Sequence, residues 1–216
     1  MNLDRPASAD LQSAADLQVE SLTPDRRDEL VTFLGEDGFV DNPEWSDCYC
    51  QWPFEDSGKS EEGSDADGDE SIPEGFDVGA YNRRLACSRI DARIMRGHLA
   101  LREDRIVGWC AAGPRERYSV LGDILGDGAD SVGAIMCFVV KPASRGKGVG
   151  TALLNAALDE FRAGGLAYAE AYPRRDASSE AAKYHGSLGM YLAAGFTVHD
   201  ERDDGTTVVR LQLASR

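Results

Sequence analysis

One stretch decides the fold: AIMCFVVKPASRGKGVGTALL, residues 134–154. Residues 134–140 form a continuous apolar run, which is typical of a strand buried on both faces of a sheet. Pro142 ends that strand. From Val149 onward, apolar residues recur at helical spacing as far as Gly164-Gly165, where a helix is expected to end. The stretch therefore predicts a buried strand, a glycine-rich loop and an amphipathic helix, in that order.

The loop at residues 145–151, Arg-Gly-Lys-Gly-Val-Gly-Thr, is expected to bind an anion. Glycines let a backbone approach a ligand closely, and free N–H groups at the start of a helix point toward anionic oxygens. Arg145 and Lys147 add positive charge for a phosphate. In a protein with 38 acidic and 23 basic side chains, such a cationic loop indicates a local site for a pyrophosphate.

Two other phosphate-binding motifs fit this loop less well. A Walker loop requires G-x-x-x-x-G-K-[ST], but Gly148 follows the Gly-Lys pair here. A dinucleotide fingerprint requires G-x-G-x-x-G, and Thr151 stands where its third glycine should be, although Glu170 lies where a ribose-binding acid would. Only 66 residues follow position 150, too few for the remaining strands of that fold. A dinucleotide enzyme is therefore the least favoured hypothesis.

The rest of the chain predicts one α/β domain with a mixed sheet. The region of residues 1–16 is expected to be a flexible tail, and residues 55–71, which carry eight acidic side chains, a disordered insertion. A single domain then covers residues 17–216. Its expected strands are residues 17–22, 98–102, 106–111, 166–172, 197–202 and 206–213, and its expected helices are residues 24–34, ended by Gly35, 81–95 and 188–194.

Composition excludes several classes of protein. A net charge of −15 argues against nucleic-acid binding, because repelled phosphates forfeit the counterion-release term. No apolar run reaches 18 residues and the start of the chain is polar, so we expect neither a membrane span nor a secretory signal, and a cytoplasmic protein. Five cysteines are an odd number, which argues against a disulfide framework. Cys48 and Cys50 lack a second pair at zinc-ligand spacing, so no metal site is expected.

Two motifs resemble those of the GNAT acyltransferase superfamily. Residues 140–154 match its central pattern [Q/R]-x-x-G-x-[G/A] through Arg145, Gly148 and Gly150, and Tyr191 precedes Gly195-Phe196 as in its second motif. The order of expected elements matches over residues 17–213. The resemblance implies an α/β GNAT fold: a mixed, mostly antiparallel central sheet flanked by helices and splayed between its two middle parallel strands.

The same resemblance implies an acetyl-CoA-dependent N-acetyltransferase that joins an acetyl group to the amine of a small molecule or peptide by direct attack in a ternary complex. The alternative is a catalytically silent GNAT domain that binds CoA as a sensor or scaffold. A homodimer is one alternative for its assembly. By resemblance, Tyr191 protonates the departing thiolate, and many members carry an asparagine at the position of Tyr184. The residues that the resemblance places along the pantetheine arm and around the pyrophosphate are Phe138, Val139, Val140, Arg145, Gly146, Lys147, Gly148, Val149, Gly150 and Thr151.

Acetyl transfer requires a base, because an amine attacks only when it is neutral. In the expected strand at residues 168–172, alternation places Glu170 and two tyrosines on one face, so we expect Glu170 to be the base. His98 and His185 are its rivals, because histidine titrates near neutral pH. Cys137 would permit a covalent route, but no histidine partner is near it in the sequence, and a buried cysteine is expected instead.

An aromatic-rich segment is the only signal for the acceptor. Trp45, Tyr49, Trp52 and Trp109 would form a wall for a compact organic or cationic group. Alternatively, the tryptophans seal this segment onto the sheet, because each buries a large area.

The types of charged residue favour adaptation to salt, and the alternative is an ordinary acidic protein from a high-GC genome, which also exchanges lysine for arginine. Only four of the 23 basic residues are lysines, and aspartate outnumbers glutamate 23 to 15. An aspartate-rich, lysine-poor surface repels itself unless salt screens it. We therefore expect the melting temperature to fall as NaCl is lowered from molar to millimolar concentration, as measured by differential scanning calorimetry. A melting temperature that rises on dilution of the salt would contradict this.

Overall fold

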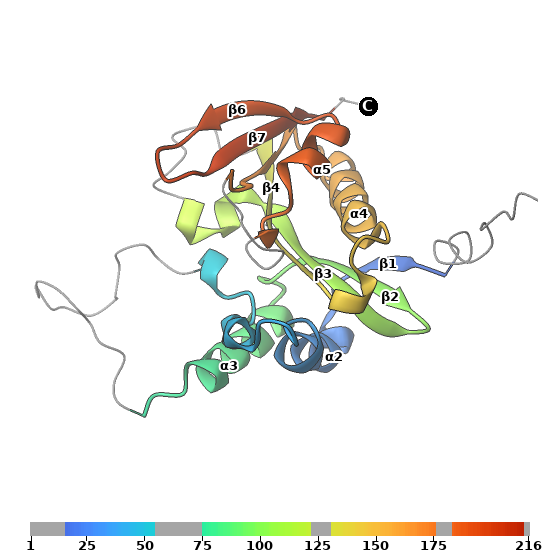
Figure 1. The fold of residues 1–216 in the computed structure, drawn as a ribbon, viewed down its shortest axis with the longest axis vertical. Helices are drawn as coiled ribbons and strands as arrows, with labels where there is room; N and C mark the ends of the chain where they lie inside the picture. The colour runs from blue at the N-terminus through green and yellow to red at the C-terminus, as the bar shows by residue number, and fades with distance from the viewer. Residues whose placement is uncertain (1–15, 55–74, 122–130, 176–182, 214–216) are drawn as a thin grey trace, which may run out of the picture.

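Seven strands form one sheet in the computed structural model, which describes residues 16–54, 75–121, 131–175 and 183–213 (Figure 1). The order is β1-β2-β3-β4-β5-β7-β6, and only β4 and β5 run parallel. This confirms the expected fold class. Residues 1–15 of the predicted tail (1–16) and the predicted insertion at 55–71 lie outside the described residues. The strands are β1 (Gln18–Ser21), β2 (Gly97–Arg102), β3 (Arg105–Pro114), β4 (Val132–Val140), β5 (Tyr168–Ala171), β6 (Thr197–Glu201) and β7 (Thr207–Gln212).

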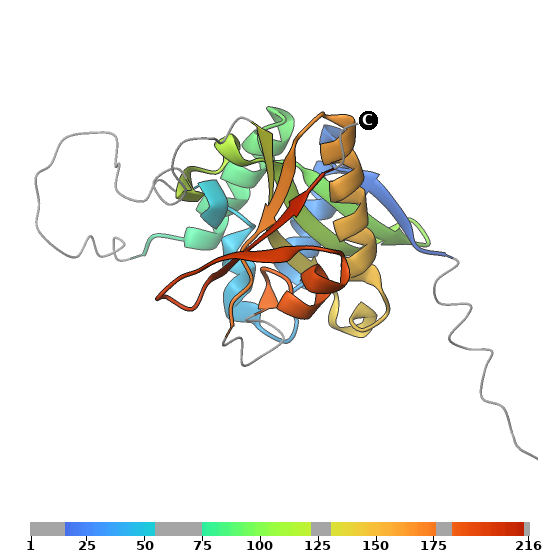
Figure 2. The ribbon, with the colours of Figure 1, turned by 90° about the horizontal axis from the view of Figure 1, so that it is seen from above.

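Helices cover both faces of the sheet (Figures 1 and 2). One face carries α4 (Val149–Ala163) and α5 (Leu188–Ala193), and the other carries α2 (Arg27–Thr32) and α3 (Val78–Asp91). The apolar stripe of α4 is buried, as its spacing predicts. Each face thus has its own hydrophobic core, and β4 contributes side chains to both.

The sheet opens between β4 and β5. The two strands pair only from Val132 to Ile135, although β4 continues to Val140. On its other edge β4 skips one residue against β3: Ala111 pairs with Cys137 and Ala112 with Ile135, which leaves Met136 as a β-bulge. A bulge bends and twists its strand. The last five residues of β4 therefore leave β5 and form one wall of a gap in the sheet.

The first helical region differs from its prediction at Gly35. The helix does not end there but continues as a π-helical turn, Phe33–Asp37. A Cβ added to Gly35 would lie 2.7 Å from the hydroxyl oxygen of Tyr49. The glycine therefore serves the close approach of an aromatic side chain and not the end of a helix.

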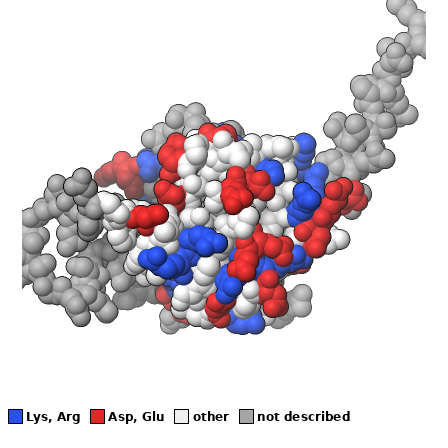
Figure 3. All heavy atoms as spheres, turned by 90° about the horizontal axis from the view of Figure 1, so that it is seen from below, with Lys and Arg blue, Asp and Glu red and all other residues white. Residues whose placement is uncertain are grey.

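Surface arginines are extensively paired with carboxylates around α2. Arg26 contacts Glu20, Glu29 and Asp104 at 2.6–2.9 Å, and Arg27 contacts Asp91 at 2.7 Å. On the face drawn in Figure 3, basic and acidic side chains are interspersed and form no broad basic area. None of the helices in the described part of the chain has the length and hydropathy needed to cross a bilayer.

Glu170, the predicted base, is instead the centre of a buried ionic cluster. Its carboxylate has no exposed surface and pairs with Arg210 of β7, with Arg115 at 3.4 Å and with the hydroxyl of Tyr172 at 3.0 Å. Each of these groups donates a hydrogen bond to the carboxylate or attracts its charge. These contacts would have to break before the carboxylate could accept a proton from a substrate. We therefore assign Glu170 to holding β5 against β7.

Replacing Glu170 by glutamine should lower the free energy of unfolding by about 3 kcal/mol, because it leaves two arginines beside a neutral amide in a buried site. Urea denaturation in high salt measures this loss. The control is Asp159→Asn, which breaks an exposed pair with Arg162 and should cost less than about 1 kcal/mol. Equal urea midpoints for the two variants would contradict the structural assignment.

Candidate functional site

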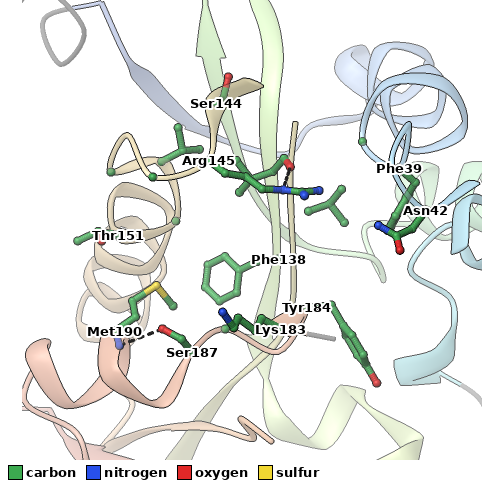
Figure 4. Close-up of a pocket in the computed structure, with 18 residues that line it drawn as sticks. Phe39, Asn42, Phe138, Ser144, Arg145, Thr151, Lys183, Tyr184, Ser187 and Met190 are labelled. Atoms are coloured by element: carbon green, nitrogen blue, oxygen red, sulfur yellow. Dashed lines mark hydrogen bonds between the residues drawn. The ribbon is translucent and has the colours of Figure 1, made fainter. Parts of the chain in front are cut away.

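A cavity of about 430 Å³ lies over the open end of β4. Figure 4 shows its walls: Phe138 of β4 in the centre, the loop at Arg145 and the start of α4 at Thr151 on one side, and Phe39 and Asn42 across from them. The segment of residues 183–187, which leads into α5, closes another side. The glycine-rich loop and the end of β4, which are adjacent in the sequence, therefore line the same cavity.

The start of α4 presents free backbone N–H groups to this cavity. Gly148 is the N-cap residue, and no side chain caps the helix. The first hydrogen bond of the helix runs from the N–H of Ala152 to the carbonyl of Gly148, so the N–H groups of Val149, Gly150 and Thr151 precede it. Such a helix start favours an anion through both its N–H groups and its dipole.

Two glycines make this loop conformation accessible. Gly146 has φ +70° and Gly148 has φ +79°, in the left-handed region that other residues rarely adopt. A Cβ at either position would meet nothing within 4 Å, so the loop surface is open. The glycines thus combine an unusual backbone with room for a ligand.

The two cations of the loop are used differently from the prediction. Arg145 donates from Nη1 and Nη2 to Asp41 at 2.5 and 3.1 Å and from Nε to the carbonyl of Val140 at 3.0 Å. Its backbone N–H donates to Pro142. Arg145 therefore holds the loop against β4, and its charge is already paired. Lys147 is exposed and does not line the cavity.

The exposed edge of β4 is partly occupied by the chain itself. The N–H of Phe138 donates to the carbonyl of Tyr184 at 2.6 Å, and Nδ1 of His185 lies 2.6 Å from the carbonyl of Met136. Val139 pairs with β3, opposite Trp109. We expected the backbone of residues 138–140 to hold an acetyl carbonyl. The N–H of Phe138 is not available for this, because it already donates to Tyr184.

Tyr191 lies behind this segment. It has no exposed surface, its hydroxyl donates to the carbonyl of His185 at 2.7 Å, and its ring packs on Phe196. Burial raises the pKa of its hydroxyl well above the ordinary value. A Cβ on Gly186 would lie 2.8 Å from that hydroxyl oxygen, so the chain passes close over it. The structure does not bring Tyr191 to the cavity wall, and its hydroxyl positions His185.

His185 is a titratable group that contacts the backbone of β4 at the gap and lines a third cavity, of about 140 Å³. Because a carbonyl only accepts hydrogen bonds, the 2.6 Å contact to Met136 fixes the proton on Nδ1 and leaves Nε2 with a lone pair. Burial lowers the pKa of the imidazole to about 4, so the ring is neutral near pH 7. From the sequence it was only a rival of Glu170, since nothing in the sequence indicates the carbonyl that orients it.

The remaining candidates lie apart from the gap or do other work. His98, the other rival, lies on β2, and its Nε2 contacts the carboxylate of Glu160 on α4 at 3.1 Å. Cys137 faces Cys50, with 3.6 Å between the sulfur atoms, and both thiols are free. Within the described ranges, no group of three or more histidine, cysteine, aspartate or glutamate side chains is arranged to hold a metal ion.

A second cavity, of about 310 Å³, adjoins the first. Trp45 and Trp52 line it, as the aromatic-wall hypothesis expected. The other two members of that wall do not: Trp109 is fully buried in the core, and Tyr49 packs on the first helical region. Both alternatives are therefore partly right, because two aromatic residues face a cavity and two seal the fold.

Comparisons with known proteins agree with this architecture. The GNAT domain of S. lividans PAT is 15% identical over 91% of this chain and 90% of its own, with a TM-score of 0.55. The protein yncA of Salmonella typhimurium, solved with its cofactor acetyl-CoA, is 15% identical over 93% and 96%, with a TM-score of 0.51. PaiA N-acetyltransferase of Thermoplasma acidophilum, solved with coenzyme A, is 13% identical over 91% and 98%, with a TM-score of 0.50.

These low identities show the fold, and the family follows from the sequence itself. No curated protein matches this sequence significantly. The family model described as "Acetyltransferase (GNAT) family" matches residues 61–190, more than half of the chain. Together with the splayed sheet and the glycine loop, this match shows that the chain belongs to the GNAT family of acetyltransferases.

Proposed function

We propose that this protein transfers the acetyl group of acetyl-CoA to the amine of a small molecule or peptide, by direct attack in a ternary complex. The observation that carries the proposal is the uncapped start of α4, which opens with two left-handed glycines onto a cavity that reaches the gap in the sheet. Acetyl-CoA as cosubstrate fits the family, and structural neighbours were solved with acetyl-CoA or CoA.

The pyrophosphate of acetyl-CoA would lie against residues 146–151, where the backbone N–H groups of Val149, Gly150 and Thr151 donate to its oxygens. From there the pantetheine arm would follow the cavity past Phe138 toward the gap. Phe138, Val139 and Val140 of β4 all line the cavity, which supports this path. Arg145 contributes by holding the loop in place and not by contact with phosphate.

The reaction needs one base. The nitrogen of the neutral amine attacks the thioester carbonyl carbon, a C–N bond forms, the C–S bond breaks, and the CoA thiolate leaves with the electron pair. The amine loses one proton, and we assign its acceptance to Nε2 of His185, whose tautomer is fixed by Met136. Tyr191 supports this histidine through the carbonyl that it holds. The proton can then pass to the thiolate.

A second candidate function is a silent domain that binds CoA without transfer. Two observations favour it: Glu170 and Tyr191 are both fully buried, and the N–H of Phe138 already has an acceptor. The two functions differ in release of free CoA thiol from acetyl-CoA when amines are supplied, which only the enzyme produces.

Gly150→Glu should abolish the rise in melting temperature that acetyl-CoA produces, because it places a carboxylate at the expected pyrophosphate position. Unlike its neighbour Gly148, Gly150 has an ordinary helical conformation, and a Cβ there meets only the sulfur of Met190 at 3.5 Å. The backbone is therefore not strained by the change. Thermal shift with acetyl-CoA, CoA, NAD and ATP measures the effect.

The matched control is Asn155→Glu, which adds the same charge to an exposed position of the same helix. It should keep the full shift with acetyl-CoA and CoA. Stabilisation of Gly150→Glu equal to that of the control would show that CoA does not bind at this helix.

His185→Asn should lower kcat about 100-fold or more, since general base catalysis typically contributes that much. The asparagine amide can still donate to the carbonyl of Met136, so acetyl-CoA affinity should stay within about threefold of that of the unchanged protein. Steady-state release of CoA thiol and a binding titration measure the two quantities.

His199→Asn is its control, because His199 is exposed on β6 and faces no cavity described here. It should leave kcat within about twofold. A His185→Asn protein with unchanged kcat would remove histidine from the mechanism.

A further inference from the structure

We propose that the second cavity is the acceptor site, and that it takes a primary amine attached to a flat apolar body that carries no carboxylate. The inference rests on the proposed function and adds the class of substrate. It follows from the position of the cavity, its lining and its charge.

The position of the cavity lets two substrates meet. It shares Phe39 and Tyr184 with the first cavity, so the two are contiguous. Phe138 lines the first and Cys137 the second, and neighbouring residues of a strand point to opposite faces. A molecule in the second cavity would therefore approach β4 from the side opposite α4, while acetyl-CoA lies on the α4 side.

The lining selects a flat apolar group. Four aromatic rings face the cavity, from Phe39, Trp45, Trp52 and Tyr184, and the rest of its lining is mainly thiols. Trp45 meets Tyr184 edge to face, with 5.3 Å between ring centroids. About 310 Å³ is at the lower end of the range for small-molecule sites, so a one-ring amine fits and a large conjugate does not. Such walls offer few hydrogen bonds to an aminosugar.

The charge of the lining favours a substrate that carries one ammonium group and no carboxylate. Among the described residues that line the cavity, Glu44 is the only charged side chain, and it is exposed. A single carboxylate beside indole rings suits one ammonium group, through ion pairing and cation–π attraction. The described part of the lining contains no arginine or lysine, so it offers the carboxylate of an amino acid no cationic partner. A polyamine would present a second ammonium group to an apolar wall.

The proposed base is next to this cavity. The ring of His185 lies 4.1 Å from the ring of Tyr184 and 5.4 Å from that of Trp52, measured between centroids. Both partners line the second cavity. His185 itself lines the third cavity, of about 140 Å³, which shares Trp52 and Tyr184 with the second. An amine bound against these two rings would therefore lie near the imidazole and β4 together, as deprotonation and attack require.

The experiment compares four amines at fixed acetyl-CoA: 2-phenylethylamine, phenylalanine, spermidine and glucosamine. We expect kcat/KM for 2-phenylethylamine to exceed that for each of the others at least tenfold, as measured by release of CoA thiol. Glu44→Gln should raise KM for 2-phenylethylamine about fivefold or more with little change in kcat. The control, Glu103→Gln, removes the same charge from the exposed turn between β2 and β3 and should change neither.

Tryptophan fluorescence supplies a binding measurement that does not depend on turnover. Trp45 and Trp52 face the cavity, whereas Trp109 is fully buried, so bound 2-phenylethylamine should change the emission of the first two. The change should shrink in Trp45→Phe and Trp52→Phe and weaken in Glu44→Gln.

The outcomes separate the inference from the proposed function. Acetylation that favours phenylalanine, spermidine or glucosamine, or that ignores Glu44→Gln, overturns the inference and leaves the transferase function intact. Binding of 2-phenylethylamine that depends on Glu44, without acetylation of any amine, supports the acceptor cavity and overturns the transferase. If 2-phenylethylamine does not bind and no amine is acetylated, both the inference and the proposed function are overturned.

Discussion

The early separation of β4 from β5 is the constraint on which the site depends. A strand that loses its neighbour leaves backbone groups that need partners, because buried N–H and C=O groups are almost always hydrogen-bonded. Residues 184 and 185 satisfy two of them, at Phe138 and Met136. The repair has a chemical consequence: it places the ring of Tyr184 where the two cavities meet, and an imidazole of fixed tautomer against that ring. Tyr191 holds this segment from behind, and Gly186 lets the chain pass over it.

The proposed anion site would let an acidic protein bind a diphosphate. The net charge of −15 repels an anion at long range, and the guanidinium of Arg145 is already paired with the carboxylate of Asp41. What remains is local: backbone N–H groups at the start of a 15-residue helix, with no side chain to cap them. The first turn of α4 contains no acidic residue that would satisfy these N–H groups, and their dipoles act only at short range. Binding of a diphosphate at the proposed site is thereby compatible with the acidic composition of the chain.

The sequence predicted local features well and long-range partners poorly. Hydrophobic periodicity located β4 and α4, and glycine spacing located the loop between them, because these signals are carried by adjacent residues. Strand alternation also placed Glu170 on the correct strand. It could not show that Arg115 and Arg210, 55 and 40 residues away, would neutralise it. The contact that orients His185, our proposed base, could not be predicted for the same reason, since the carbonyl of Met136 is 49 residues away.

The arrangement of the two cavities also bears on the route of transfer. Cys137 faces the second cavity, beside Cys50, so an acetyl group on its sulfur would occupy the space that an acceptor needs. The neighbour of the Cys137 sulfur is the thiol of Cys50. The hydrogen bond between the two thiols and burial raise the pKa of Cys50, so Cys50 stays protonated and cannot serve as a base. Two contiguous cavities on opposite faces of β4, by contrast, can hold donor and acceptor together, and alignment of two bound reactants supplies a large part of the rate enhancement. The geometry therefore favours direct attack over an acetyl-cysteine intermediate.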